Sequence, residues 1–140
     1  GRIFSLNLEN GTERYSNDLR GGCSVSLTIS EFGNTAAAIC DDNRVRIIDV
    51  NCLHVMHTLD VGSSSDLCIA SCVSPQGGTI AVGCDSGKIT VLAAHSGGGL
   101  NTVDTTRSLF DLCYSPDDKF IQFEGSDVGS INVSTGRLTG

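Results

Sequence analysis

One pattern recurs along this chain at intervals of 42 to 44 residues, measured between matching aspartates. Each copy contains a short turn that starts with serine, an apolar run, an aspartate and a further run of alternating apolar residues. The clearest copy spans residues 67–91, an earlier one contains 30–47, and a later one contains 115–133. The matching aspartates are Asp41, Asp85 and Asp127. A period of this length is typical of repeated units that cannot bury their own apolar faces and must stack on one another.

The apolar residues follow the period of a β-strand, and no segment keeps a helical period for three turns. The alternating sets are Val25, Leu27 and Ile29; Val45 and Ile47; and Ile89 and Val91. Small residues fill the runs 36–39 and 80–83, which we expect to form second strands where neighbouring units approach closely. Each copy then needs an outer fourth strand, which we expect within residues 14–19, 53–59 and 100–103.

The turns Ser-Pro-Gln-Gly at 74–77 and Ser-Pro-Asp-Asp at 115–118, together with the recurring aspartates, resemble the WD-repeat β-propeller family. In that family each unit supplies the four antiparallel strands of one blade. The chain departs from the family pattern because it contains no tryptophan, so that Ile48-Asp49 is the only near relative of the Trp-Asp pair. No Gly-His pair precedes any blade. The resemblance covers essentially the whole chain and implies degenerate repeats in an all-β fold.

The repeat divides the chain into the end of one blade (1–20), two blades (21–62 and 63–105) and most of another (106–140). Four blades make about the smallest closed ring, and seven need roughly 300 residues at this repeat length. We therefore expect three to four blades of a larger ring, with seven as the expected total. The remaining blades would come from the same chain or from another subunit, because an open arc leaves two faces unpacked, and we expect those faces to be apolar.

Composition excludes several classes of function. The formal net charge is −7 and the nine basic residues are scattered, whereas nucleic-acid binding needs clustered Lys and Arg. No apolar stretch reaches the roughly 18 residues of a membrane-spanning helix. The seven cysteines are an odd number without a closely spaced pair, which favours structural thiols in a reducing compartment over a disulfide framework. We therefore expect a cytoplasmic protein, with a cytoskeletal or ciliary location as the alternative.

Three patterns resemble chemical sites and fall short of them. The segment 83–88 (Gly-Cys-Asp-Ser-Gly-Lys) is one residue shorter than a phosphate-binding loop, and it joins two expected strands where that motif needs a following helix. Cys52, His54 and His57 are close in sequence, but His54 and His57 are three apart on an expected strand and so point to opposite faces. Only Cys52 and His54 share a face, and two ligands do not make a zinc site. No nucleophile signature surrounds Cys68 or Cys113. The sequence thus predicts no catalytic residue, no metal site and no cofactor.

The three aspartates have a structural interpretation. A carboxylate in a tight turn accepts nearby backbone N–H groups and fixes the entry to the next strand. We therefore expect Asp41, Asp85 and Asp127 to stabilise their turns. Exposed positions beside the turns are the candidate partner-binding rim. These residues are Asn43, Arg44, Arg46, Ser86, Lys88, Asp117, Asp118 and Lys119.

The resemblance implies a non-catalytic scaffold that holds protein partners within a multiprotein complex. Rigid sheets position loops, and loops can vary without disturbing the packing of the blades. Two alternatives remain open: a structural propeller subunit of a ciliary or cytoskeletal assembly, and a non-catalytic propeller segment of a larger enzyme. The net negative charge favours a basic partner.

Overall fold

The computed structural model describes residues 2–19, 24–63, 65–105 and 108–139. Within these residues the protein is all-β, as expected, and all the strands belong to antiparallel sheets. The described residues contain no helix, and therefore none that could cross a membrane. Of the expected blade boundaries, 62/63 lies in the loop before the strand that starts at Cys68. The boundaries 20/21 and 105/106 involve residues outside the described ranges.

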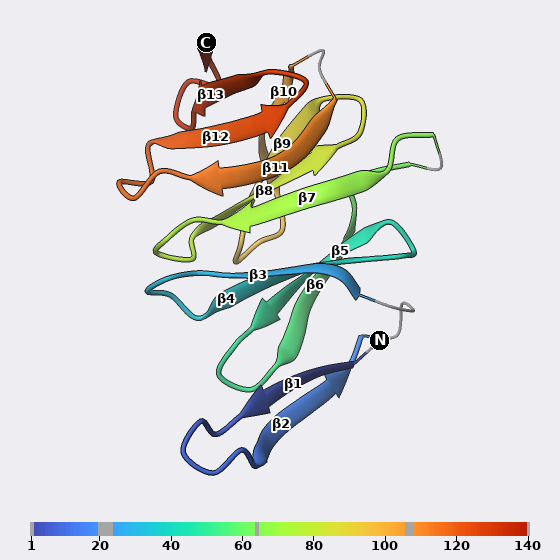
Figure 1. Cartoon of the computed structure of the whole chain (residues 1–140), viewed down its shortest axis with the longest axis vertical. Coiled ribbons are helices and arrows are strands. Elements are labelled where there is room, and N and C mark those ends of the chain that lie inside the picture. Colours follow the sequence, from blue (N-terminus) through green and yellow to red (C-terminus); the bar gives the residue numbers. More distant parts are fainter. Residues whose placement is uncertain (1, 20–23, 64, 106–107, 140) are drawn as a thin grey trace.

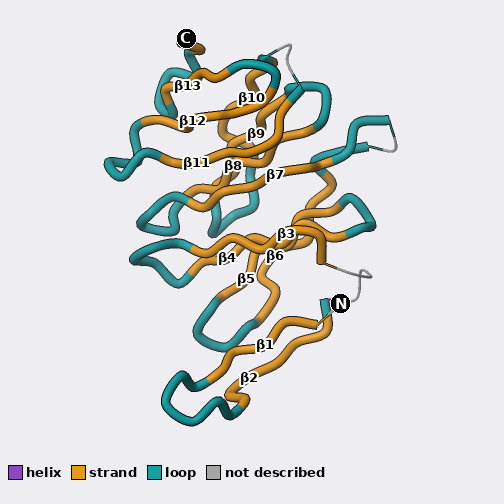
Figure 2. Tube along the Cα trace, viewed as in Figure 1, coloured by secondary structure: helices purple, strands orange, loops and turns teal. Residues whose placement is uncertain are grey.

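The strands form one hairpin and three sheets of four strands in simple chain order (Figures 1 and 2). The N-terminal hairpin contains β1 (Arg2–Leu6) and β2 (Glu13–Asp18). The first sheet contains β3 (Ser24–Ile29), β4 (Thr35–Cys40), β5 (Arg44–Asp49) and β6 (His54–Asp60). The second sheet contains β7 (Cys68–Val73), β8 (Thr79–Cys84), β9 (Lys88–Ala93) and β10 (Gly99–Asp104). The third sheet contains β11 (Leu109–Tyr114), β12 (Phe120–Gly125), β13 (Val128–Asn132) and β14 (Leu138–Thr139).

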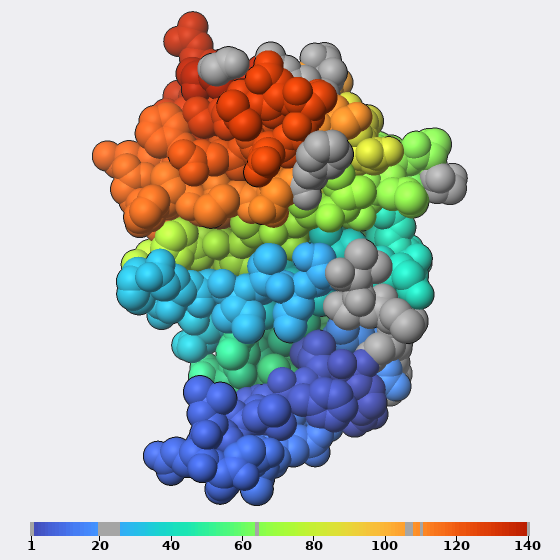
Figure 3. Space-filling view, in the orientation of Figure 1, coloured from blue at the N-terminus to red at the C-terminus, as the bar shows by residue number. Residues whose placement is uncertain are grey.

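The hairpin and the sheets stack in sequence order along the long axis of the molecule, as propeller blades do (Figure 1). Figure 3 shows the same order as successive bands of colour from blue to red. The first strand of each sheet lies beside its counterpart, because β7 contacts both β3 and β11. The expected outer strands are confirmed as β2, β6 and β10. The first and second sheets therefore each have two apolar faces, one covered by the preceding unit and one by the following sheet.

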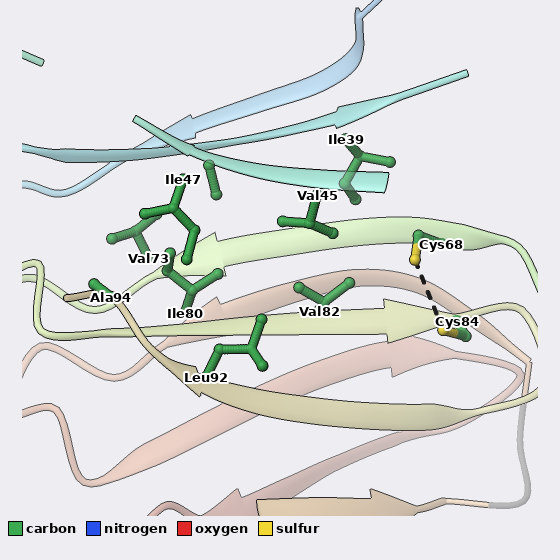
Figure 4. Packing of buried hydrophobic residues seen from close by; sticks show 11 residues of the cluster. Ile39, Val45, Ile47, Cys68, Val73, Ile80, Val82, Cys84, Leu92 and Ala94 are labelled. Atoms are coloured by element: carbon green, nitrogen blue, oxygen red, sulfur yellow. Dashed lines mark hydrogen bonds between the residues drawn. The ribbon is translucent and has the colours of Figure 1, made fainter. Parts of the chain in front are cut away.

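Apolar side chains fill the seams between neighbouring sheets. In the seam between the first and second sheets, Val45 and Ile47 point toward Ile80 and Val82 (Figure 4), and all four are fully buried. Ile89 is buried in the seam between the second and third sheets. The alternation seen in the sequence therefore separates side chains that face the preceding sheet from those that face the following one. The expectation that Val45 and Ile89 pack between blades is confirmed.

The serine turns repeat in atomic detail. The hydroxyl oxygens of Ser30, Ser74 and Ser115 each accept a hydrogen bond from the backbone N–H five residues later, at 3.2, 3.1 and 3.0 Å. Each serine N–H also donates to the carbonyl of that same residue. Neighbouring turns touch as well: a Cβ on Gly33 would clash with the backbone carbonyl oxygen of Gln76. Glycine at position 33 therefore lets the first and second sheets approach closely at these serine turns.

Candidate partner-binding surfaces

The eight candidate rim residues lie at two opposite ends of the sheets. Successive strands run antiparallel, so consecutive hairpin turns alternate between the ends (Figure 1). We call the end with turns 41–43, 85–87 and 126–127 the aspartate end, and the end with turns 30–34 and 115–119 the serine end. Asn43, Arg44, Ser86 and Lys88 belong to the aspartate end. Asp117, Asp118 and Lys119 belong to the serine end, so the eight residues cannot form one continuous rim.

Arg46 is not an exposed rim residue, which corrects the sequence interpretation. Only 3% of it is exposed, and its guanidinium donates to both carboxylate oxygens of Asp42, at 3.0 and 2.7 Å. Arg46 alternates with Val45 and Ile47, which face the second sheet, so its side chain lies on the other side of β5. The hydrogen bonds from Arg46 hold the pKa of Asp42 below its ordinary value of 3.8. This pair anchors the hairpin tip from within the fold.

Arg44 and Lys88 begin the third strand of their sheets and face an aspartate that ends the fourth strand. The register pairs Arg44 with Asp60 and Lys88 with Asp104. Arg44 Nε lies 2.9 Å from a carboxylate oxygen of Asp60, and both side chains are exposed. The N-terminal hairpin repeats the arrangement, with Arg2 opposite Asp18. Sequence reasoning missed this charge pairing, although the aspartates at 18, 60 and 104 follow the same period as the rest of the repeat.

Asn43 connects the first sheet to the second. It has a φ of +62°, a conformation that asparagine tolerates better than most residues. Its side-chain Nδ2 donates to the backbone carbonyl oxygen of Ser63 at 2.8 Å, and its side-chain Oδ1 accepts from the N–H of Cys68 at 2.7 Å. The half-buried Asn43 side chain is thus occupied by the loop that leads into β7. A partner that binds this end would therefore contact the residues beside Asn43 rather than the Asn43 side chain.

The turn around Ser86 is fixed by Asp66, a residue that sequence reasoning did not single out. One carboxylate oxygen of Asp66 accepts from the Ser86 N–H at 3.0 Å, and the other accepts from the Ser86 hydroxyl at 2.7 Å. Asp66 lies 20 residues before Ser86 in the loop that enters the second sheet. No local pattern joins the two positions; only the hairpin register, which brings residue 68 beside residue 84, could have indicated the contact.

The recurring aspartates play unequal parts. Asp41 and Asp85 are exposed, and within the described residues neither carboxylate makes a hydrogen bond, contrary to expectation. Their side chains point to solvent, and Asp42 and Asp66 accept the bonds that were expected of them. Asp127 accepts from the N–H of Val128 at 2.9 Å. It stands at the last position of its turn, because the hairpin between β12 and β13 is one residue shorter than its two counterparts.

At the serine end, Asp117 holds its own turn. One of its carboxylate oxygens accepts from the Ser115 hydroxyl at 2.6 Å and from the Lys119 N–H at 3.1 Å. The hydrogen bond from Ser115 lowers the pKa of Asp117. Asp118 adopts a φ of +63°, at the turn position where Gly77 has +79°. Lys119 is exposed.

The two outward faces of the stack differ in character. The outward side of the third sheet forms an open hollow of about 520 Å³, lined among others by Asp111, Gln122 and Glu124. Gln122 and Glu124 occupy positions where the second sheet has Ala81 and Gly83, so this face mixes polar and charged side chains with the exposed Val128 and is less apolar than expected. The N-terminal hairpin instead exposes Phe4 and Leu6 on its outward side.

The cysteines and histidines are dispersed over the fold. Cys40, Cys68, Cys72 and Cys84 are buried, but Cys52 and Cys113 are exposed, so the expectation of uniformly structural thiols is wrong for these two. Cys23 lies outside the described residues. His57 Nε2 lies 2.6 Å from the carbonyl oxygen of His95. The described part of the chain contains no group of three or more side chains suited to hold a metal ion.

Comparison with known proteins adds no assignment. No protein-family model matches the sequence, and no curated protein matches it.

Proposed function

We propose that these residues are blades of a degenerate WD-repeat β-propeller that serves as a non-catalytic scaffold for protein partners in a multiprotein complex. The repeat of 42 to 44 residues and the stacked four-stranded sheets support the family assignment. The remaining blades of the ring come from the same chain or from another subunit. The free thiols within the described residues support a reducing, cytoplasmic location.

The observation that carries this proposal is the construction of the aspartate end. Its turns are held by Asn43, by Asp66 and by the ion pair between Asp42 and the buried Arg46. Asp41 and Asp85 remain exposed above them and make no side-chain hydrogen bond within the described residues. A surface of this kind presents free carboxylates on a rigid base, so binding a partner there orders few additional groups. We therefore place the binding of a basic protein segment at this end.

The test compares two charge variants of the chain. Asp41→Lys/Asp85→Lys changes the aspartate end, and Glu9→Lys/Glu31→Lys makes the same change in net charge at the serine end. All four carboxylates belong to exposed residues without side-chain hydrogen bonds in the described structure, so both variants are expected to fold. Quantitative affinity capture followed by mass spectrometry then measures which proteins each immobilised chain retains.

We expect one set of partners to bind the wild type and the Glu9/Glu31 variant, and to be lost from the Asp41/Asp85 variant. Binding should weaken as salt rises, because exposed charges are screened. Equal capture by all three chains would place the interaction elsewhere than the aspartate end. Capture of no protein by any of them would contradict the scaffold function itself.

A further inference from the structure

Two buried cysteines face each other across the first hairpin of the second sheet. Cys68 and Cys84 are cross-strand partners in the register of β7 and β8. Their sulfur atoms lie 4.0 Å apart, and Figure 4 shows them pointing toward one another. Cys68 is 7% exposed and Cys84 is fully buried. The two cysteines are 16 residues apart in the sequence, so no local pattern indicates the pair, and the hairpin brings them together.

The backbone around this pair has the arrangement that suits a disulfide. The N–H of Asp85 donates to the carbonyl oxygen of Leu67 at 2.9 Å, one residue outside the pair on each strand. The N–H of Cys68 donates to Asn43 and is therefore not paired with Cys84. Cys68 and Cys84 thus form a non-hydrogen-bonded antiparallel pair, whose Cα atoms are typically about 4.5 Å apart. Disulfides span Cα separations of roughly 4.4 to 6.8 Å.

The first sheet contains a natural counterpart of this pair. Cys40 stands in the position of Cys84, 44 residues earlier, and its register partner is Ser24. The two hairpins also share a register shift after this first pair. The register therefore pairs two cysteines in one sheet and a cysteine with a serine in the other, which supplies a matched reference within one molecule.

We propose that Cys68 and Cys84 are a dithiol site that is oxidised by hydroperoxide to a cross-strand disulfide. A small, uncharged oxidant is required, because the pair is almost completely buried. The hydrogen bond between the sulfurs lowers the pKa of Cys84 and raises that of Cys68, so Cys84 supplies the first nucleophile.

The reaction balances with hydrogen peroxide as the only oxidant. The Cys84 thiolate attacks one peroxide oxygen, the O–O bond breaks, and the departing hydroxide takes the Cys68 proton to form water. The Cys68 thiolate then attacks the sulfenic sulfur of Cys84, forming the S–S bond and releasing hydroxide, which is protonated to the second water. Two thiols and one peroxide thereby give one disulfide and two water molecules. The sulfurs approach each other by about 2 Å to reach bonding distance.

The experiment treats the reduced, folded chain with hydrogen peroxide. The reaction is quenched in acid, the chain is denatured, free thiols are alkylated, and the chain is digested with pepsin to cleave between the two cysteines. We expect peptides containing Cys68 and Cys84 to be joined, with a mass about 2 Da below their sum, and dithiothreitol to separate them. Cys40 should remain alkylated under the same conditions. Recovery of alkylated Cys68 and Cys84 as abundantly as Cys40, while the exposed Cys52 and Cys113 are oxidised, would overturn the proposal.

Two variants exclude an origin in unfolded chains. Cys68→Ser reproduces the serine–cysteine pair of the first sheet, and its Cys84 should become as resistant as Cys40. Ser24→Cys creates a second dithiol pair in the same register, and Cys40 should then join position 24. A Cys68–Cys84 link that forms only in urea, or as readily there as in the folded chain, would show that the hairpin geometry does not direct the reaction.

Discussion

The first and second sheets are related by a constant offset of 44 residues, so each position in one has a counterpart in the other. Val45 corresponds to Ile89, and Ser30 to Ser74; both offsets are 44. The seam residues are fully buried in both sheets, and the serine turns make the same hydrogen bonds. The hairpin tips at the aspartate end are anchored differently: Asp42–Arg46 closes one, whereas Ser86 and Thr90 occupy those places in the other.

This difference distinguishes two structural roles within the repeat: the seams pack sheet against sheet, and the tips close the hairpins. The seams must match a neighbouring sheet along a whole face, so they accept little change beyond one apolar residue for another. A tip needs only to satisfy a few backbone groups, and either an arginine on the same sheet or an aspartate from the preceding loop can provide the anchor. Tips can therefore change their exposed chemistry while the seams stay constant, which is the property expected of a binding scaffold.

The largest expected effect tests the shared seams. Val45→Asp and Ile89→Asp each place an unpaired carboxylate among fully buried side chains. The cost is several kcal/mol, comparable with the roughly 5–15 kcal/mol that stabilises a whole domain, so both variants should unfold. Circular dichroism and urea titration measure the loss. Thr102→Asp, on the exposed side of β10, is the control that should remain folded. If Ile89→Asp unfolded cooperatively at a urea midpoint close to that of the wild type, the two seams would not contribute equally to stability.

The next effect distinguishes the two tips. Asp42→Ala leaves the guanidinium of Arg46 buried without its carboxylate, and its side chain is only 4% exposed. The Asp42 side chain is 28% exposed, so the loss should lie below that of a fully buried pair, at about 1–3 kcal/mol for the unsatisfied guanidinium. Ser86→Ala, the counterpart in the second sheet, removes an exposed hydrogen bond and should cost less than about 1 kcal/mol. Urea unfolding of both variants measures the difference, and equal losses would show that the ion pair does not anchor its tip.

An exposed ion pair on the same strand serves as the control for that result. Arg44→Ala removes the contact with Asp60, where both side chains are largely exposed. Surface pairs contribute about 0–1 kcal/mol, so this variant should resemble Ser86→Ala in stability. A loss as large as that of Asp42→Ala would mean that charge on β5 matters more than burial.

Acid should reduce the contribution of the Asp42–Arg46 pair. The folded pKa of Asp42 is depressed, so the stabilisation is fully present above the ordinary value of 3.8 and is lost as the pH falls through the folded pKa. The difference in unfolding free energy between wild type and Asp42→Asn should therefore shrink below pH 3.8. Urea titrations at successive pH values measure it, with Ile47→Val, a fully buried apolar change, as a reference whose difference stays constant. A wild-type advantage over Asp42→Asn that persists undiminished in acid would contradict this origin.

The seams and turns were predictable from the sequence because their signals are local and repeated. Alternation places Val45 and Ile89 on the buried side, and serine followed by a turn recurs at each unit. Arg46 was misassigned because alternation indicates the face of a strand, while the burial of a charged side chain depends on a partner. Asp42, four residues earlier, was the available signal.

The remaining features depend on residues that are distant in the sequence. Asp66 reaches Ser86 across 20 positions, and the sulfur atoms of Cys68 and Cys84 meet across 16. These contacts follow from the hairpin register, including the shift between Cys68 and Ala70. Periodicity alone does not specify where a strand shifts its register. The polar side chains on the outward face of the third sheet were likewise unexpected, because the position of Gln122 within the repeat predicts a small apolar residue.

The last comparison is between Asp66, which accepts hydrogen bonds from Ser86, and Asp85, which precedes Ser86 in the chain and has the smallest expected effect. Asp66→Ala removes two hydrogen bonds to Ser86 and leaves its N–H without that acceptor, so we expect a loss of about 1–2 kcal/mol. Asp85→Ala should change the unfolding free energy by less than about 0.5 kcal/mol, because the Asp85 side chain is exposed and has no such bond. Urea unfolding measures both, and hydrogen exchange at the Ser86 N–H should accelerate only in Asp66→Ala. Faster exchange of the Ser86 N–H in Asp85→Ala would instead show that Asp85, the recurring aspartate, stabilises the turn. The second tip would then depend on its own hairpin, as the first does, and the contrast between the two sheets would lose its basis.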